Sequence, residues 1–187
     1  MDQRKIERAV KLFLEGIGED VNRPGLKDTP KRVARMCEEI FAGIKADASR
    51  VIRPLHAEEH DEIVLIRDIP FHSVCEHHLL PFIGKAHVAY IPHANRVSGL
   101  SKIARVVELE AKKLQVQERL TTTIAETIVA ALKPKGVLVI LEAEHLCMTM
   151  RGVHKPGAIT VTSVVRGLFR ENAATRAEAL ALIRTPR

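Results

Sequence analysis

The chain has few aromatic side chains: no tryptophan, one tyrosine and five phenylalanines among its 187 residues. Proteins that bind single-stranded nucleic acid commonly stack the bases on aromatic rings, so this composition argues against that class of protein. The net charge of +6 nevertheless favours a polyanionic partner. We therefore expect no nucleic-acid partner, and a small molecule that carries phosphate groups fits the charge.

Long apolar runs are also missing. No stretch approaches the roughly 18 uninterrupted apolar residues that a membrane span requires. Residues 1–5 lead into a polar amphipathic pattern, not into the apolar core of a signal peptide. Cysteine occurs three times, an odd number that suits a reducing compartment in which thiols stay available for metal. The sequence therefore predicts a cytoplasmic protein that does not enter a membrane.

Helical periodicity dominates the first part of the chain. Apolar residues recur at helical spacing over residues 3–17. Thr29-Pro30 is typical of a second helix start, with Thr29 as the N-cap and Pro30 at the first helical position. We expect residues 1–54 to form an N-terminal helical region and residues 55–187 to form the main domain.

Short β-branched runs follow, and they predict strands on either side of a pair of helices. The predicted strands span residues 62–69, 84–91, 137–142 and 159–165. The predicted helices begin near Ser101, a good N-cap, and after Gln117, and a terminal helix spans residues 176–183. Paired strands around paired helices indicate an α+β fold, with two helices on one face of an antiparallel sheet and the N-terminal helices before it.

The predicted connection between the first two strands is about fourteen residues long, and loops of that length are usually functional. It contains CEHH at residues 75–78, and HLC follows at residues 145–147. Thiolates and imidazole suit zinc, and structural zinc sites normally close with four protein ligands. Cys75, His78 and Cys147 are three convincing donors, which leaves one position free for water, as in a catalytic centre.

Two further histidines, His77 and His145, each stand next to or near a predicted ligand. A metal with an open position lowers the pKa of bound water to near 7, and hydrolysis then needs a group that transfers protons. Imidazole has the intrinsic pKa for that role at neutral pH. The alternatives are that these histidines only orient the ligands, or that the site is two buried thiols and surface histidines.

Four cationic side chains are candidates for binding phosphate. Lys102 and Arg105 lie at the start of a predicted helix, where the helix dipole favours anions. Arg151 follows Cys147 by four residues, and Arg32 lies near the start of its own helix. Each alone is more often a solvated surface charge than a ligand contact, so the prediction rests on the group.

Gln117 and Glu118 are adjacent at the boundary between the paired helices. A carboxylate beside a carboxamide offers acceptors and donors to the edge of a purine or a pterin. The alternative interpretation is that Glu118 complements the dipole at a helix N-terminus.

Four separated motifs, in the same order along the chain, resemble the zinc-dependent form of GTP cyclohydrolase I. They are SVCEHHLLPFIGKAHVAYIP at residues 73–92, GLSKIAR at 99–105, QVQERLT at 115–121 and EHLCMTMRGV at 144–153. The likeness runs from about Glu19 to the C-terminus. It implies a tunnelling fold, or T-fold, for residues 55–187, and a homodecamer of two pentamers with active sites at subunit interfaces.

The resemblance also implies a reaction and the residues that carry it. GTP is hydrolysed at guanine C8, formate is released, and 7,8-dihydroneopterin triphosphate forms, the first step of tetrahydrofolate and pterin biosynthesis. The matching positions make Cys75, His78 and Cys147 the ligands of Zn²⁺ and give proton transfer to His77 and His145. The substrate-binding positions fall on Glu118 and Gln117 for guanine, Ser101 near the ribose, and Lys102, Arg105, Arg151 and Arg32 for the triphosphate, with Arg32 from a neighbouring subunit.

Two other functions remain open at this point. A nitrile reductase of queuosine synthesis shares the T-fold, but it uses a nucleophilic cysteine and a nicotinamide cofactor without zinc. The CEHH motif and a second metal-type cysteine argue against it. A basic zinc-stapled RNA-binding module needs a fourth zinc ligand and an affinity that falls steeply with salt, and the sequence suggests neither.

Overall fold

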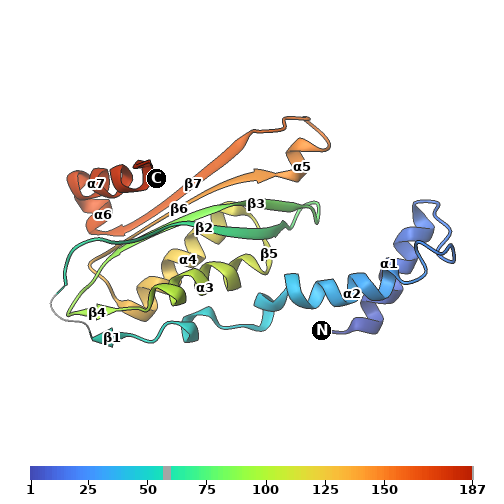
Figure 1. Cartoon of the computed structure of the whole chain (residues 1–187), viewed down its shortest axis with the longest axis horizontal. Helices are drawn as coiled ribbons and strands as arrows, with labels where there is room; N and C mark the ends of the chain where they lie inside the picture. The colour runs from blue at the N-terminus through green and yellow to red at the C-terminus, as the bar shows by residue number, and fades with distance from the viewer. Residues whose placement is uncertain (57–59, 187) are drawn as a thin grey trace.

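The computed structural model describes residues 1–56 and 60–186. Helices α1 (Gln3–Gly16) and α2 (Thr29–Ile40) pack on each other and project from the rest of the molecule as an arm (Figure 1). Two short 3₁₀ helices, η1 (Ala42–Lys45) and η2 (Ala48–Val51), then lead towards the sheet. The predicted helical start of the chain is confirmed, whereas the domain boundary at residue 54 stays a prediction.

The ends of the arm helices follow from local capping. Asp2 caps α1, because its side chain accepts a hydrogen bond from the Lys5 amide at 3.0 Å. The predicted N-cap of α2 is wrong by one residue: Asp28 holds that position and Thr29 is already helical, with Pro30 in the first turn.

Five of the described strands form one sheet in the order β5-β2-β3-β6-β7. The long strands are antiparallel neighbours: β2 (Val64–Cys75), β3 (Pro81–Ile91), β6 (Gly136–His145) and β7 (Ile159–Gly167). The short β5 (Leu114–Gln115) pairs with β2 in parallel, and a separate pair joins β1 (Leu55–His56) to β4 (Arg96–Val97). The four long strands occur as predicted along the chain, two before the paired helices and two after them.

The first two long strands run further than the sequence suggested. A β-bulge between Ile66 and Ile69, with Asp68 in the left-handed region at φ 58°, interrupts the alternation on which the prediction depended. Beyond the bulge, Pro70 still pairs with Lys85 and the ladder continues. The predicted long loop is therefore wrong: residues 76–80 connect the strands, and the CEHH motif lies in a tight turn.

Helices α3 (Leu100–Ala111) and α4 (Gln117–Leu132) cover one face of the sheet, as predicted (Figure 1). Apolar residues at helical spacing, such as Ile103 and Ile124, are fully buried against the strands. The predicted cap of α3 is wrong, because Gly99 holds the N-cap position and Ser101 lies exposed in the first turn.

The opposite face of the sheet carries the C-terminal helices α6 (Leu168–Glu171) and α7 (Ala173–Arg184) (Figure 1). Phe169 and Ala179 of these helices are buried in a second, smaller apolar cluster with residues of β3 and β6. Among the described residues, no helix is both long enough and apolar enough to span a membrane.

The strand register brings distant segments to one end of the sheet. Phe82, near the start of β3, pairs with His145, the last residue of β6. The short helix α5 (Leu146–Thr149) follows directly, so it lies at the same end as the turn between β2 and β3 (Figure 1). Residues 75–78 and 145–147 therefore meet although about seventy residues separate them.

Candidate metal centre

Cys75, His78 and Cys147 form a compact group, called here the metal group. One donor atom from each residue lies within 4.8 Å of the other two. Cys75 is buried at the end of β2, and its backbone amide and carbonyl are bonded to Leu80 and Leu79 across the turn, both at 2.9 Å. The structure therefore brings together the three donors that the sequence predicted.

The donor set fits zinc. Two sulfurs and one imidazole are ligands that zinc prefers, and three protein donors are typical of a catalytic zinc site. Burial raises the pKa of the Cys147 thiol, and the neighbouring Cys75 raises it further. Two adjacent thiolates repel each other, so a cation between them is the natural means of ionising both.

His145 is held on two sides beside this group. Its ring stacks on Phe82, with ring centroids 4.6 Å apart and planes 2° apart. Its Nε2 lies 2.7 Å from Oε1 of Gln117. Burial lowers the pKa of His145, although the nearby Glu118 carboxylate opposes the shift. The imidazole is therefore oriented by the protein and favoured in its neutral form.

Gln117 determines which nitrogen of His145 carries the proton. The Gln117 side chain is 1% exposed, and its Nε2 donates to Leu141 O, Thr160 O and Thr162 Oγ1 at 3.0–3.1 Å. Because that amide nitrogen donates, Oε1 is left as the acceptor, so His145 donates from Nε2 and keeps a lone pair on Nδ1. The Gln117 side chain is thus occupied within the protein, whereas Glu118 beside it is exposed.

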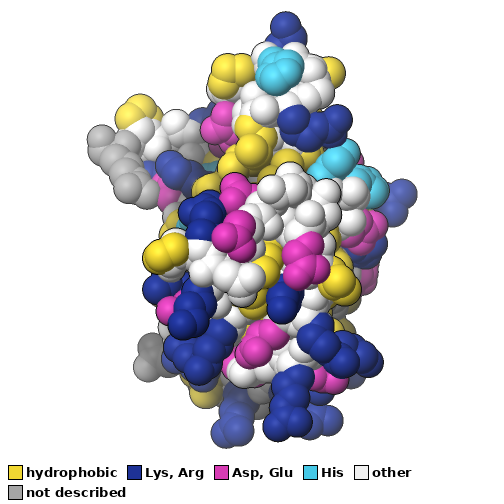
Figure 2. Space-filling model, turned by 90° about the vertical axis from the view of Figure 1, so that its right-hand side faces the viewer, with side chains coloured by type: hydrophobic (Ala, Val, Ile, Leu, Met, Phe, Trp, Pro, Cys, Tyr) yellow, Lys and Arg dark blue, Asp and Glu magenta, His cyan; other side chains and the backbone are white. Residues whose placement is uncertain are grey.

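The other predicted histidine and one cation also lie at the metal group. His77 is exposed and packs edge-on against His78, with ring centroids 6.4 Å apart. Arg151 donates from Nη1 to His78 Nε2 at 2.8 Å. Figure 2 looks onto this end of the molecule and shows histidine side chains at the surface.

The remaining predicted cations lie elsewhere. Lys102 and Arg105 line a pocket of about 420 Å³, called here the α3 cation pocket, whose lining includes no metal-group residue. Lys102 lies nine residues, or about 14 Å of helix, before the C-terminal end of α3. That end is the one next to β5, the strand that pairs with Cys75. Arg32 is exposed on the arm, over which lysine and arginine side chains gather in Figure 2. One chain therefore does not bring these cations, or the exposed Ser101, to the metal group.

Sequence reasoning missed several residues next to these sites. Arg50 and Arg53 line the α3 cation pocket beside Lys102, but they lie in and just after the short helix η2, where the sequence carries no motif. Arg119 forms an ion pair with Glu76, inside the CEHH motif. In the sequence, an arginine on a helix cannot be told from a solvated charge. Arg119 and Glu76 are also 43 positions apart, so no local pattern indicates their contact.

Comparison with known proteins identifies the family. A family model described as GTP cyclohydrolase I matches residues 6–184. A GTP cyclohydrolase 1 from Carboxydothermus hydrogenoformans is 63% identical over 183 residues, covering 98% of this chain and 95% of that protein. The GTP cyclohydrolase 1 of Bacillus subtilis is 60% identical over 180 residues, covering 96% and 95%.

Among solved structures, the apo form of an archaeosine synthase QueF-like protein has a TM-score of 0.49 and 18% identity, over 58% of this chain and 97% of that chain. The family match and the two curated relatives each cover nearly the whole chain. The chain therefore belongs to the GTP cyclohydrolase I family.

Proposed function

We propose that this chain hydrolyses GTP at guanine C8 and yields 7,8-dihydroneopterin triphosphate and formate, the reaction that its family resemblance implies. The observation that carries the proposal is the metal group of Cys75, His78 and Cys147 with an oriented His145 beside it. The nitrile reductase and the RNA-binding module are not favoured, because the matching relatives of full length are named GTP cyclohydrolase 1.

Zn²⁺ is the metal that the donor set fits best, and Cys75, His78 and Cys147 would hold it. When bound, zinc supplies the Lewis acidity that makes water a nucleophile near neutral pH. The protein's own contribution at this point is to fix the three donors. The strand pairing of Cys75 and the short turn after it hold Cys75 and His78, and the pairing of β3 with β6 brings Cys147 to them.

Proton transfer falls to the two histidines. His145 donates from Nε2 to Gln117, so Nδ1, which keeps its lone pair, is the atom that accepts a proton. His77 is exposed beside His78, where it can exchange protons with solvent. Opening the imidazole ring of guanine and releasing formate requires more than one proton transfer, which two histidines with different exposure supply.

Substrate binding is divided between the exposed polar residues. Glu118 is assigned to the guanine edge, because it lies exposed in the first turn of α4 near His145 and its carboxylate accepts hydrogen bonds. Gln117 contributes by holding His145, since its side chain is buried and bonded within the chain. Ser101 is assigned to the ribose, and the triphosphate to Arg151, Lys102, Arg105 and Arg32, because phosphate oxygens pair well with cationic donors.

The proposed assembly is supported by the separate locations of the predicted phosphate-binding residues within one chain. Arg151 lies at the metal group, but Lys102 and Arg105 line a separate pocket and Arg32 lies on the arm. In the proposed assembly, a second copy of the chain brings the α3 cation pocket to the metal group. Strand β7 is the last strand in the sheet order, and it exposes Ile159 and Val161, so it offers an edge to another copy. We propose a homodecamer of two pentamers in the cytoplasm, with residues 1–54 as the helical region and 55–187 as the T-fold catalytic domain.

A product assay tests the proposal. Purified protein is incubated with GTP, and formate and the fluorescence of the oxidised pterin are measured with and without a zinc chelator. We expect one formate per GTP consumed, and loss of both signals after chelation. Formate release that continues undiminished after the metal has been removed would reject the metal assignment, and absence of any pterin would reject the reaction.

A further inference from the structure

Arg119 connects the ligand-bearing turn to the helices behind it. It lies in the first turns of α4 and forms a bidentate ion pair with both carboxylate oxygens of Glu76, the residue that follows the ligand Cys75. A planar guanidinium that engages both oxygens fixes direction as well as distance.

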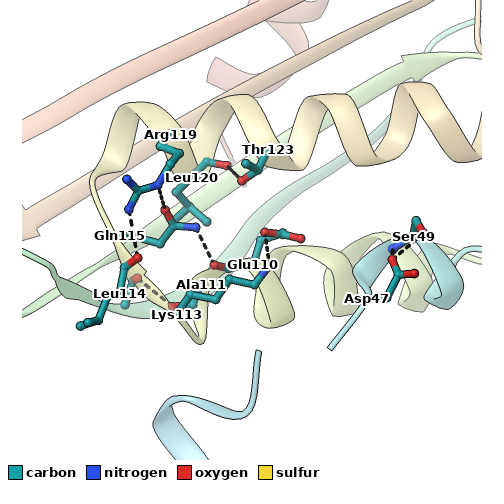
Figure 3. A network of polar contacts seen from close by, with 11 residues as sticks. Asp47, Ser49, Glu110, Ala111, Lys113, Leu114, Gln115, Arg119, Leu120 and Thr123 are labelled. Carbon is teal, nitrogen blue, oxygen red and sulfur yellow. Dashed lines mark hydrogen bonds and ion pairs between the residues drawn. The ribbon is translucent and has the colours of Figure 1, made fainter. Parts of the chain in front are cut away.

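The same guanidinium is itself held by the α3–α4 junction. Arg119 Nε donates to Gln115 Oε1 at 2.9 Å, and Nη2 donates to the Leu114 carbonyl at 3.0 Å (Figure 3). Gln115 is 2% exposed and donates from Nε2 to the Glu110 carbonyl at 3.0 Å. Arg119 therefore cannot swing freely, because β5 and the turn that carries Glu76 both hold its guanidinium.

The backbone of Gln115 also contacts the turn. Gln115 pairs with Cys75 in the parallel ladder, and its carbonyl accepts a hydrogen bond from the Glu76 amide at 3.1 Å. Main-chain pairing thus fixes Cys75 and the start of Glu76. Within the turn, the Leu79 amide donates to the Cys75 carbonyl at 2.9 Å, and Arg151 donates to His78 at 2.8 Å. The Glu76 side chain is the contact that ties the turn to α4.

We propose that Arg119 is a positioning residue of the metal centre: by holding the Glu76 carboxylate it pre-organises the turn from Cys75 to His78, which supplies two of the three metal donors. The inference rests on the proposed metal site. A donor that is already in place binds without first losing conformational freedom, so pre-organisation raises affinity. The contact also occupies both oxygens of a carboxylate that lies next to a ligand, which keeps that carboxylate from acting as a further donor.

The effect should be local. Arg119 is 46% exposed and Glu76 33% exposed, and partly exposed ion pairs contribute little to global stability. Removing the contact is therefore expected to weaken metal binding without unfolding the protein. A loss of zinc affinity without a loss of stability distinguishes a positioning role from a merely structural one.

The test compares variants of the full chain loaded with Zn²⁺ or with Co²⁺. Zinc affinity is measured by competition with a chromophoric chelator, and the visible spectrum of the cobalt form reports the geometry of the donors. For Arg119→Gln we expect zinc affinity to fall by about 10- to 100-fold, the range typical of residues that orient metal ligands, with an altered cobalt spectrum and an unchanged melting temperature. Arg119→Lys keeps the charge but loses the planar guanidinium, so its zinc affinity should lie between those of the wild type and Arg119→Gln.

Two further variants keep the test decisive. Glu76→Gln removes the negative charge of the pair and should reproduce the loss, even if Arg119→Gln proves poorly folded. Arg166→Gln removes another ion pair between distant segments, with Glu126 at 2.7 Å, and should leave zinc affinity unchanged. Wild-type zinc affinity and cobalt spectrum in both Arg119→Gln and Glu76→Gln would overturn the inference. A wild-type protein that binds no zinc would instead overturn the metal assignment on which it rests.

Discussion

The metal group and the α3 cation pocket differ in how much of each site one chain supplies. The metal group is complete: Cys75, His78 and Cys147 converge within 4.8 Å, and strand pairing fixes the segments that carry them. The α3 cation pocket is open to solvent, and Lys102 and Arg105 in it have no ion-pair partner among the described residues. The comparison teaches that one chain supplies all three donors of the metal group, whereas the proposed contacts to the triphosphate would require a second chain.

Removing a donor should have the largest effect. For Cys147→Ser we expect turnover to fall by about 1,000-fold or more, because a catalytic metal supplies several kcal/mol of transition-state stabilisation. Zinc content and formate release are measured on the same sample. Cys37→Ser is the matched control, since Cys37 lies on α2 in the arm and should retain both. Full turnover in Cys147→Ser would contradict the metal assignment.

Loss of the oriented imidazole should come next. His145→Ala is expected to bind zinc normally and to lose about 100-fold in kcat, within the range for general acid–base catalysis. The measurement is single-turnover kinetics together with zinc content. Unaltered rates in a zinc-loaded variant would show that His145 takes no part in the reaction.

Gln117 separates what the sequence predicted from what the structure shows. If Gln117 positions His145, Gln117→Glu should lower kcat by about tenfold and change the KM for GTP much less. If it binds guanine directly, as the family resemblance predicted, KM should rise instead. Steady-state kinetics at a range of GTP concentrations distinguishes the two, and a rise in KM alone would restore the original prediction.

A substitution in the α3 cation pocket should have the smallest effect, and that effect should be confined to GTP binding. We expect Lys102→Ala to raise the KM for GTP by about tenfold with little change in kcat, since a hydrogen bond to a charged group contributes roughly 1.5–3 kcal/mol. Competition by inorganic triphosphate should weaken in parallel, while competition by guanosine should not. Lys5→Ala, on an exposed face of α1, serves as the control. An equal loss for guanosine would contradict a role in holding phosphate.

Mixed oligomers sharpen the comparison further. In the proposed assembly, Lys102→Ala and Cys147→Ser damage different halves of one site. Co-expressed chains should therefore form some sites with both halves intact, and activity at low GTP should exceed the mean of the two variants. Activity no higher than that mean would indicate that each chain holds its own triphosphate.

The chemistry-bearing residues were predictable because their residue types are informative. Cysteines and histidines at fixed spacing indicate a metal wherever the strands place them. The contact between residues 75 and 147 could not be predicted, because it depends on the register between β3 and β6. The length of β2 was not predictable, since the bulge at Asp68 and the following Pro70 break the alternation that marks a strand. The links from Gln117 to His145 and from Arg119 to Glu76 depend on side-chain directions at long sequence separation, which periodicity does not contain.

The most direct test of the central claim is a zinc titration of metal-depleted protein during GTP turnover. Zn²⁺ is added stepwise, and the rate of formate release is recorded against the ratio of zinc to protein chains. Because one chain supplies all three donors, the rate should rise linearly and reach its plateau at one zinc per chain. A full rate without added zinc, or a plateau at one zinc for every two chains, would contradict the account.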